Sequence, residues 1–173
     1  AGIYNVAFVI MAVVYLLPSV IYQKFLLPKI HRWASHDRKK FYQVYRVGNW
    51  VMLVLGLLAM LALWLLAPWG VKILFGDRYI GALLPLSILA LAAPARFVAS
   101  SAGAVLLTKH HLINKIYIMI IAAATNLALN FSFIPVYGAI GAAVTTVITE
   151  IFLVIMMQIY ARRYVFTDFN ERL

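Results

Sequence analysis

The sequence predicts an all-α integral membrane protein with five transmembrane helices, and three observations carry this prediction. Of the 173 residues, 65% are hydrophobic and only 12% are charged, whereas a soluble domain is about half apolar and about a quarter charged. The apolar residues gather in five long runs, and each run has the roughly 20 residues that a helix needs to cross a bilayer. These runs lack the alternation of apolar and polar residues that a transmembrane β-barrel requires, so we predict helices, which satisfy their own backbone groups in lipid.

The five predicted spans cover residues 3–22, 47–69, 80–107, 112–134 and 138–160. Pro94 lies inside the third span and is expected to kink it, because proline removes a backbone hydrogen bond. The link over residues 24–46 mixes cations with aromatic rings, which suits the headgroup layer of a membrane. Ser35 or Asp37 can cap a new helix that runs from this link into the second span. A tail over residues 161–173 follows the fifth span.

The basic residues are distributed unevenly over the links between the spans. One set of links holds twelve of the fifteen: Lys24, Lys29, Arg32, Arg38, Lys39, Lys40, Arg46, Lys109, Lys115, Arg162, Arg163 and Arg172. The other set, at residues 70–79 and 135–137, holds only Lys72 and Arg78. The net charge of +10 therefore indicates membrane topology and not nucleic-acid binding. By the positive-inside rule, the long link and the tail are cytoplasmic and the N-terminal end lies outside.

The chain opens with Ala1 directly before an apolar run, without the basic region or the cleavage site of a signal peptide. We therefore expect it to be part of a longer protein. A cytoplasmic N-terminus would need an odd number of further spans upstream.

Two charged residues, Arg96 and Glu150, lie at mid-membrane depth in the predicted spans. Each costs about 2.5–3.5 kcal/mol on insertion at the centre of a helix, so each needs a compensating partner. The helical neighbours of Arg96 are all small, namely Ala92, Ala93, Ala99, Ser100 and Gly103. Arg96 is a candidate contact for an anionic substrate, because guanidinium binds phosphate or carboxylate at two points. The alternative is an ion pair between Arg96 and Glu150. Glu150 and Thr146 share a helix face and are candidates for a coupling-ion site.

Asn126 and Asn130 lie four residues apart on one face of the fourth span. Such residues hydrogen-bond across helices or contact a substrate, and both are candidate substrate-binding residues. The fifth span carries a face of small residues, which favours close helix packing: Gly138, Gly141, Ala142, Thr145 and Thr149.

Motifs of enzymes are absent from the sequence. It contains no HExxH, GxSxG or phosphate-binding loop, and no cysteine. His110 and His111 are adjacent and do not share a helix face, so we expect no metal site there. We therefore predict neither an enzyme nor a cofactor. A membrane-embedded sugar transferase or a structural assembly subunit is the alternative from another class.

Three stretches resemble the second lobe of polysaccharide flippases: GIYNVAF at residues 2–8, LFGDRYIGA at 74–82, and NLALNFSFIPVYGAIGAAVTT at 126–146. The family is the multidrug/oligosaccharidyl-lipid/polysaccharide (MOP) exporter superfamily, in which the Wzx-type O-antigen flippases are most similar. The resemblance implies two lobes of six helices around a central cavity, as in the MATE-like transporters. This chain would form five helices of the second lobe.

The resemblance also implies a function. The chain would help to flip an oligosaccharide linked to undecaprenyl pyrophosphate across the bacterial cytoplasmic membrane by alternating access, with Arg96 meeting the pyrophosphate. A multidrug/cation antiporter of the same superfamily and a lipid II flippase are the alternatives. The implied partners are the lipid-linked oligosaccharide, membrane lipids, H+ or Na+ as coupling ion, and the polysaccharide assembly machinery.

Overall fold

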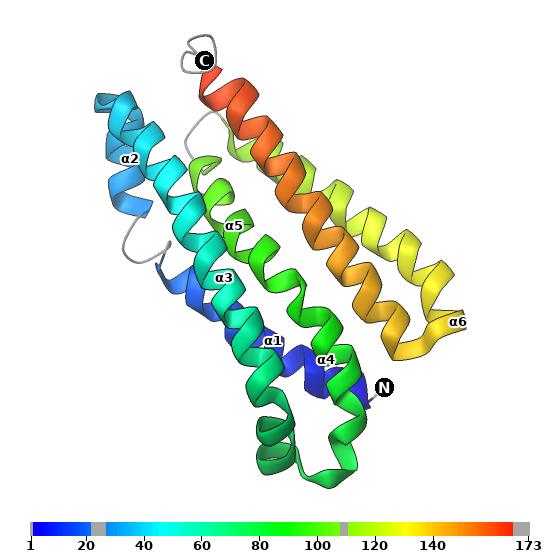
Figure 1. Cartoon of the computed structure of the whole chain (residues 1–173). Coiled ribbons are helices and arrows are strands. Elements are labelled where there is room, and N and C mark those ends of the chain that lie inside the picture. The colour runs from blue at the N-terminus through cyan, green and yellow to red at the C-terminus, as the bar shows by residue number, and fades with distance from the viewer. Residues whose placement is uncertain (1, 22–26, 108–110, 168–173) are drawn as a thin grey trace.

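The computed structural model describes residues 2–21, 27–107 and 111–167. Within these ranges the chain forms helices and no strand, so the all-helical prediction is confirmed. In chain order the helices are α1 (Gly2–Val20), α2 (Leu27–His36), α3 (Arg38–Phe75), the 3-10 helix η2 (Asp77–Ala82), α4 (Leu83–Ala90), α5 (Ala92–Val105), α6 (Leu112–Tyr160) and the π-helical turn η3 (Ala161–Val165). Figure 1 shows them packed lengthwise in one elongated bundle.

Three helical segments of the described chain are long and apolar enough to cross a membrane, which is compatible with a multi-pass protein. They are α1, α3 and the continuous stretch Leu112–Val165. A fourth is obtained if the bent pair Asp77–Ala90 and Ala92–Val105 is one span. The sequence predicted five separate spans, and the fourth and fifth of these lie in α6, one on each side of a break at Gly138.

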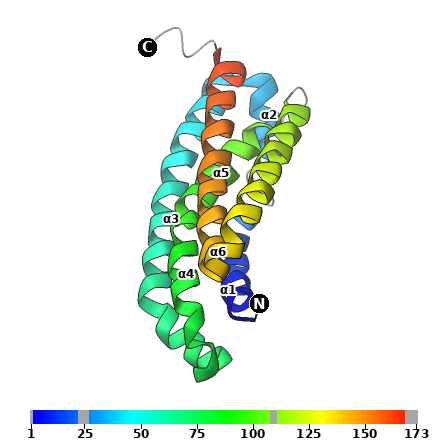
Figure 2. The same cartoon turned by 90° about the vertical axis from the view of Figure 1, so that its right-hand side faces the viewer.

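Helix α6 is a hairpin of two antiparallel arms. Gly138 is its one residue with non-helical dihedral angles, at φ 57° and ψ −129°, a conformation that glycine adopts without steric cost. Figures 1 and 2 show the chain reversing there, so that the two arms lie side by side. The sequence predicted the link at residues 135–137, and the structure places the reversal directly after it, at Gly138, because the helix continues through Pro135.

The predicted kink of the third span is confirmed. Helices α4 and α5 meet at an angle of 45° across Leu91, three residues before Pro94. Proline has no N–H group, and its ring collides with the carbonyl four residues earlier, at Ala90. The N–H of Leu91 donates to the carbonyl of Ile88 at 3.0 Å, which tightens the turn at the bend.

Helix α3 begins where the sequence placed a cap. Asp37, and not Ser35, is the capping residue, and its carboxylate accepts a hydrogen bond from the N–H of Lys40 at 3.0 Å. From there α3 runs for 38 residues and extends beyond both ends of the predicted span at residues 47–69. The link at 24–46 therefore contains α2 and the start of α3, while residues 24–26 lie outside the described ranges.

Two apolar clusters hold the bundle together. The first contains Phe41, Met52, Phe97 and Phe166, and the second contains Met11 and Val71. In contrast, the outer surface of the helices is apolar and exposed, most clearly at Leu65, Trp69, Ile73, Leu74, Phe131 and Val136, each at least 70% exposed. Exposed apolar side chains along the helices are compatible with contact with lipid.

The two ends of the bundle differ in charge. Figure 1 shows α2, the start of α3 and the end of α6 at one end, which we call the basic end because it includes Lys39, Lys40 and Arg162. The end of α3 and η2, with Lys72 and Arg78, lie at the opposite end. The fold thus agrees with the predicted sorting of the links into two sides.

Candidate functional site

A large cavity lies between α1, α5 and the two arms of α6. Its volume is about 1180 Å³, and we call it the main cavity. Its polar lining residues are Tyr4, Asn5, Arg96, Asn126, Asn130, Thr146, Thr149 and Glu150. All five candidates from the sequence, Arg96, Asn126, Asn130, Thr146 and Glu150, therefore face the same space, although they come from three predicted spans.

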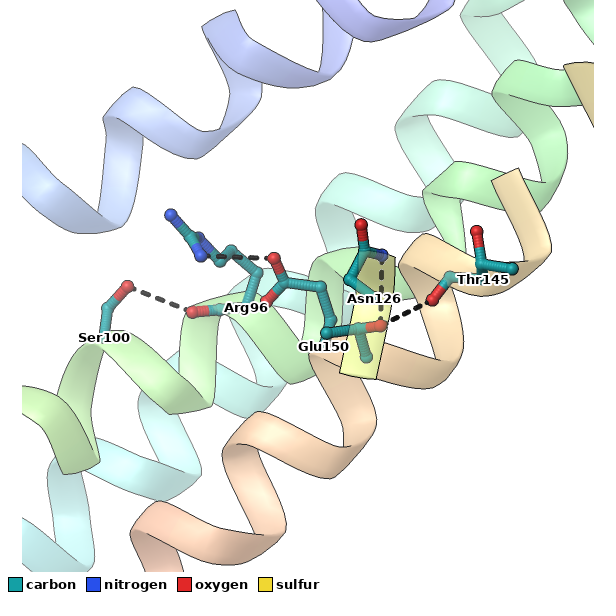
Figure 3. Close-up of polar contacts among 6 residues, drawn as sticks. Arg96, Ser100, Asn126, Thr145 and Glu150 are labelled. Atoms are coloured by element: carbon teal, nitrogen blue, oxygen red, sulfur yellow. Dashed lines mark hydrogen bonds and ion pairs between the residues drawn. The ribbon is translucent and has the colours of Figure 1, made fainter. Parts of the chain in front are cut away.

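Arg96 and Glu150 form an ion pair on the wall of the main cavity. Arg96 Nη1 donates to Glu150 Oε1 at 3.1 Å, and Figure 3 shows the two side chains pointing toward one another from α5 and the second arm of α6. The Glu150 side chain is only 14% exposed, while Arg96 is 42% exposed. The structure thus contains the pair that the sequence offered as one of two interpretations, and the guanidinium keeps an open side toward the cavity.

Helix α1 contributes an aromatic face to this pair. The guanidinium carbon of Arg96 lies 5.3 Å from the centroid of the Tyr15 ring, a distance at which a cation is attracted to the ring face. The Tyr15 hydroxyl and Glu150 Oε2 are buried and have no hydrogen-bond partner among the described residues. Because buried polar atoms are normally satisfied, these two atoms mark places where a ligand, ion or water would be stabilised.

Asn126 and Asn130 connect the two arms of α6. The side-chain amide of Asn126 donates to Thr149 Oγ1 at 3.1 Å, and that of Asn130 donates to Asn126 Oδ1 at 2.9 Å. The hydroxyl of Thr145 donates in turn to Asn130 Oδ1. Figure 3 shows Asn126 beside Glu150, with Thr145 farther along the arm. Both asparagines therefore hold the hairpin together and also line the main cavity.

Thr146 places a hydroxyl on the cavity wall next to α1. Its Oγ1 donates to the carbonyl of Ala142 at 2.8 Å and lies 3.4 Å from the Tyr4 hydroxyl. Of the small face predicted on the second arm, Gly141 and Thr145 are buried, whereas Gly138, Ala142 and Thr149 line the main cavity. A Cβ atom added to Gly141 would lie 2.5 Å from the carbonyl oxygen of Phe133, so only glycine fits between the arms there.

The small neighbours of Arg96 take part in helix packing and in the lining of a second cavity, and Ala99 does both. Ala93 and Ala99 are buried in the two apolar clusters, so they serve helix packing. Ser100 donates its hydroxyl to the Arg96 carbonyl at 3.0 Å. Together with Ala99 and Gly103 it lines a smaller cavity of about 260 Å³ on the other side of Arg96. The small neighbours of Arg96 therefore leave open space beside it.

Sequence reasoning missed Lys115, which it assigned to a link. The structure places Lys115 in the first turn of α6, where it lines the smaller cavity with Arg96. Its ammonium lies 3.3 Å from the position of a Cβ atom added to Gly103. Two cations therefore border one small space. The signal was the position of Lys115 inside the apolar run at residues 112–134.

Comparison of this chain with protein-family models, with characterised proteins and with solved structures found no match. The main cavity and its ion pair are therefore the features of this chain that indicate a function.

Proposed function

We propose that the chain is part of a multi-pass membrane transporter that moves an oligosaccharide linked to a lipid diphosphate across the bacterial cytoplasmic membrane. The observation that carries the proposal is the Arg96–Glu150 pair on the wall of a cavity of about 1180 Å³ between apolar helices. A cavity of this size exceeds what a single ion needs and has room for a polar headgroup.

Arg96 is the residue that we expect to contact the anion. Its guanidinium has five donors in a planar fork, which match two oxygens of a phosphate at once. In the present state one donor is used by Glu150 at 3.1 Å. An incoming diphosphate competes with Glu150 for Arg96, so binding of the substrate would release the carboxylate.

The released Glu150 then supplies a coupling step. A carboxylate that loses its cationic partner in a poorly hydrated site is stabilised by a proton or a metal cation. Thr146 and Thr149 line the cavity one turn from Glu150 or less along the same helix and offer hydroxyl oxygens to such an ion. The cycle needs no covalent chemistry, because alternating access only requires that the cavity open to each side in turn.

The resemblance to the MOP superfamily supports this proposal and supplies its wider frame. On that basis the chain forms five of the six helices in one lobe, with the basic end in the cytoplasm and the N-terminal end outside. A lipid II flippase would use the same anion contact. A multidrug/cation antiporter is the second candidate function, because the buried Glu150 suits a cationic substrate. The following experiment distinguishes it from the transporter of lipid-linked oligosaccharide.

The test compares variants of the protein in its natural host, with its membrane abundance and the export of lipid-linked sugar measured together. We expect Arg96→Ala to lower export about tenfold or more at normal abundance, because a hydrogen bond to a charged group contributes about 1.5–3 kcal/mol. Arg96→Lys keeps the charge but loses the fork, so it should restore export only in part. Arg78→Ala, which removes an exposed arginine from η2, is the matched control and should leave export unchanged.

The double variant Arg96→Leu with Glu150→Leu decides between substrate binding and a purely structural pair. A structural pair predicts low abundance for each single variant, since one charge is left buried and unpaired. It also predicts that the double variant recovers abundance and export. Full export from the double variant would overturn the proposal. Export that is insensitive to Arg96, with drug efflux lost on Glu150→Gln, would favour the antiporter instead.

A further inference from the structure

We infer that the protein binds the headgroup of an anionic phospholipid, such as phosphatidylglycerol, in a second cavity at the basic end. This cavity has a volume of about 600 Å³ and lies between α3, α5 and the end of α6. We call it the basic groove. Its polar and aromatic lining residues are Tyr42, Tyr45, Arg46, Asn49, Trp50, Gln158, Arg162 and Phe166. It shares no lining residue with the main cavity, so the inference does not depend on the proposed function.

The charge of the basic groove fits an anion. Arg46 comes from α3 and Arg162 from η3, both side chains are exposed, and both line the groove. The three acids in the described part of the chain are paired elsewhere, in the ion pairs Asp37–Lys40, Asp77–Lys72 and Glu150–Arg96. None of these three carboxylates neutralises the two arginines. Basic pockets between membrane helices at the headgroup level bind anionic lipid headgroups.

The wall of the groove is preorganised by a hydrogen-bond network. The Tyr45 hydroxyl donates to Gln158 Oε1, and the Asn49 amide donates to the same oxygen at 3.3 Å. Asn49 Oδ1 is left buried with no partner among the described residues. A buried acceptor without a donor is costly, and a headgroup hydroxyl, such as those of phosphatidylglycerol, would satisfy it.

An apolar extension of the groove indicates a lipid and not free phosphate. A neighbouring cavity of about 450 Å³ shares Tyr42, Arg46 and Trp50 with the basic groove. It continues along α3 past Val47 and Val51, whose side chains are exposed and apolar. A phosphate held by Arg46 would therefore have its acyl chain directed along this apolar surface. Trp50, 64% exposed, is an aromatic ring of the kind found at membrane interfaces.

The test uses the full-length protein in detergent, with bound lipid measured by native mass spectrometry against phosphatidylglycerol and phosphatidylcholine. We expect phosphatidylglycerol to be retained in preference to phosphatidylcholine. The double variant Arg46→Gln with Arg162→Gln should weaken its binding about tenfold or more, because two charge-assisted phosphate contacts are lost. The matched control is Lys39→Gln with Arg163→Gln, which removes two exposed cations from the same end without touching the groove. It should bind as the unchanged protein does.

Several outcomes would overturn the inference. The first two are equal loss of lipid in the two double variants and equal retention of phosphatidylglycerol and phosphatidylcholine. The other two are displacement of the lipid by inorganic phosphate and preferential binding of undecaprenyl phosphate over phosphatidylglycerol. If the arginine variant does not fold, Asn49→Leu keeps the inference testable, because it removes the buried acceptor and should selectively weaken phosphatidylglycerol binding. Export by the arginine variant is expected to continue, since Arg96 and the main cavity are unchanged. A failure here therefore leaves the proposed function untouched.

Discussion

Two helix contacts in this protein are built in opposite ways. Where α3 crosses α5, a Cβ atom added to Gly56 would lie 2.6 Å from Cα of Pro94, so the two backbones touch and leave no room for a polar side chain. Between the two arms of α6, Asn126 and Thr149 instead meet through their side chains. In a bilayer, helices associate by close packing or by interhelical hydrogen bonds.

The difference concerns how each contact relates to the main cavity. The α3–α5 crossing lies between the two apolar clusters and away from the main cavity, so it fixes the positions of two helices, while Pro94 there lines the basic groove. The contact between the α6 arms is polar and borders the main cavity, so the groups that hold the arms together are also available to a ligand. Near the turn the α6 arms also touch closely, because a Cβ atom added to Gly141 would lie 2.5 Å from the carbonyl oxygen of Phe133. Farther from the turn the arms meet through polar side chains that also border the main cavity.

The largest loss of stability is expected when a side chain fills the α3–α5 contact. Gly56→Ala should lower the free energy of unfolding by about 1–3 kcal/mol, because the added methyl group overlaps backbone atoms of α5. Gly70→Ala is the control in the same helix, with no heavy atom within 4 Å of the new Cβ. It should be neutral or stabilising, since alanine favours helices. Unfolding in mixed detergent micelles, followed by circular dichroism, measures both. Equal stability of the two variants would contradict a closed contact.

A smaller loss is expected when the polar contact is removed. Asn126→Ala deletes the bonds to both Thr149 and Asn130, and interhelical hydrogen bonds contribute about 0.6–2 kcal/mol. Asn5→Ala removes an exposed amide on the same cavity wall and should change stability by less than about 0.5 kcal/mol. The same unfolding assay applies. A loss at Asn126 as large as that at Gly56 would mean that the hairpin is also part of the scaffold.

The smallest effect is expected at Gly103, which tests whether the α5–α6 contact is closed like the α3–α5 contact. The nearest neighbour of an added Cβ is the ammonium of Lys115, at 3.3 Å. This is the end of a flexible side chain that can move aside, so Gly103→Ala should cost less than about 0.5 kcal/mol. Thermal stability in detergent measures it. A loss comparable to Gly56→Ala would show that Lys115 is rigidly held.

Much of the fold was accessible from the sequence because its signals are local. The length of the apolar runs predicted helices, Pro94 predicted the bend, and the two candidate caps Ser35 and Asp37 predicted the region where α3 starts, at Asp37. The α6 reversal was predicted at residues 135–137, whereas the helix accommodates Pro135 and continues beyond it. The turn instead occurs at Gly138, the residue with a positive φ angle.

The candidate site was predictable in part for the same reason. Mid-membrane depth and helix-face spacing selected five of the residues that line the main cavity. Tyr15 and Lys115 were not selected, because their relation to Arg96 depends on which helices become neighbours. Gly56 was also missed, since a single glycine in an apolar run gives no indication of the helix that it contacts. Pairing of helices is decided by tertiary packing, which periodicity does not encode.

The crossing at Gly56 has a mechanical consequence. Gly56 lies at the middle of α3, between Met52 in one apolar cluster and Met60 at the edge of the other. A stiff helix held at its midpoint behaves as a lever with a fulcrum. If α3 tilts so that Tyr45 moves away from α6 at the basic end, Leu63 on the far side of the fulcrum must swing the opposite way. One rigid-body motion would then loosen one end of the bundle while tightening the other.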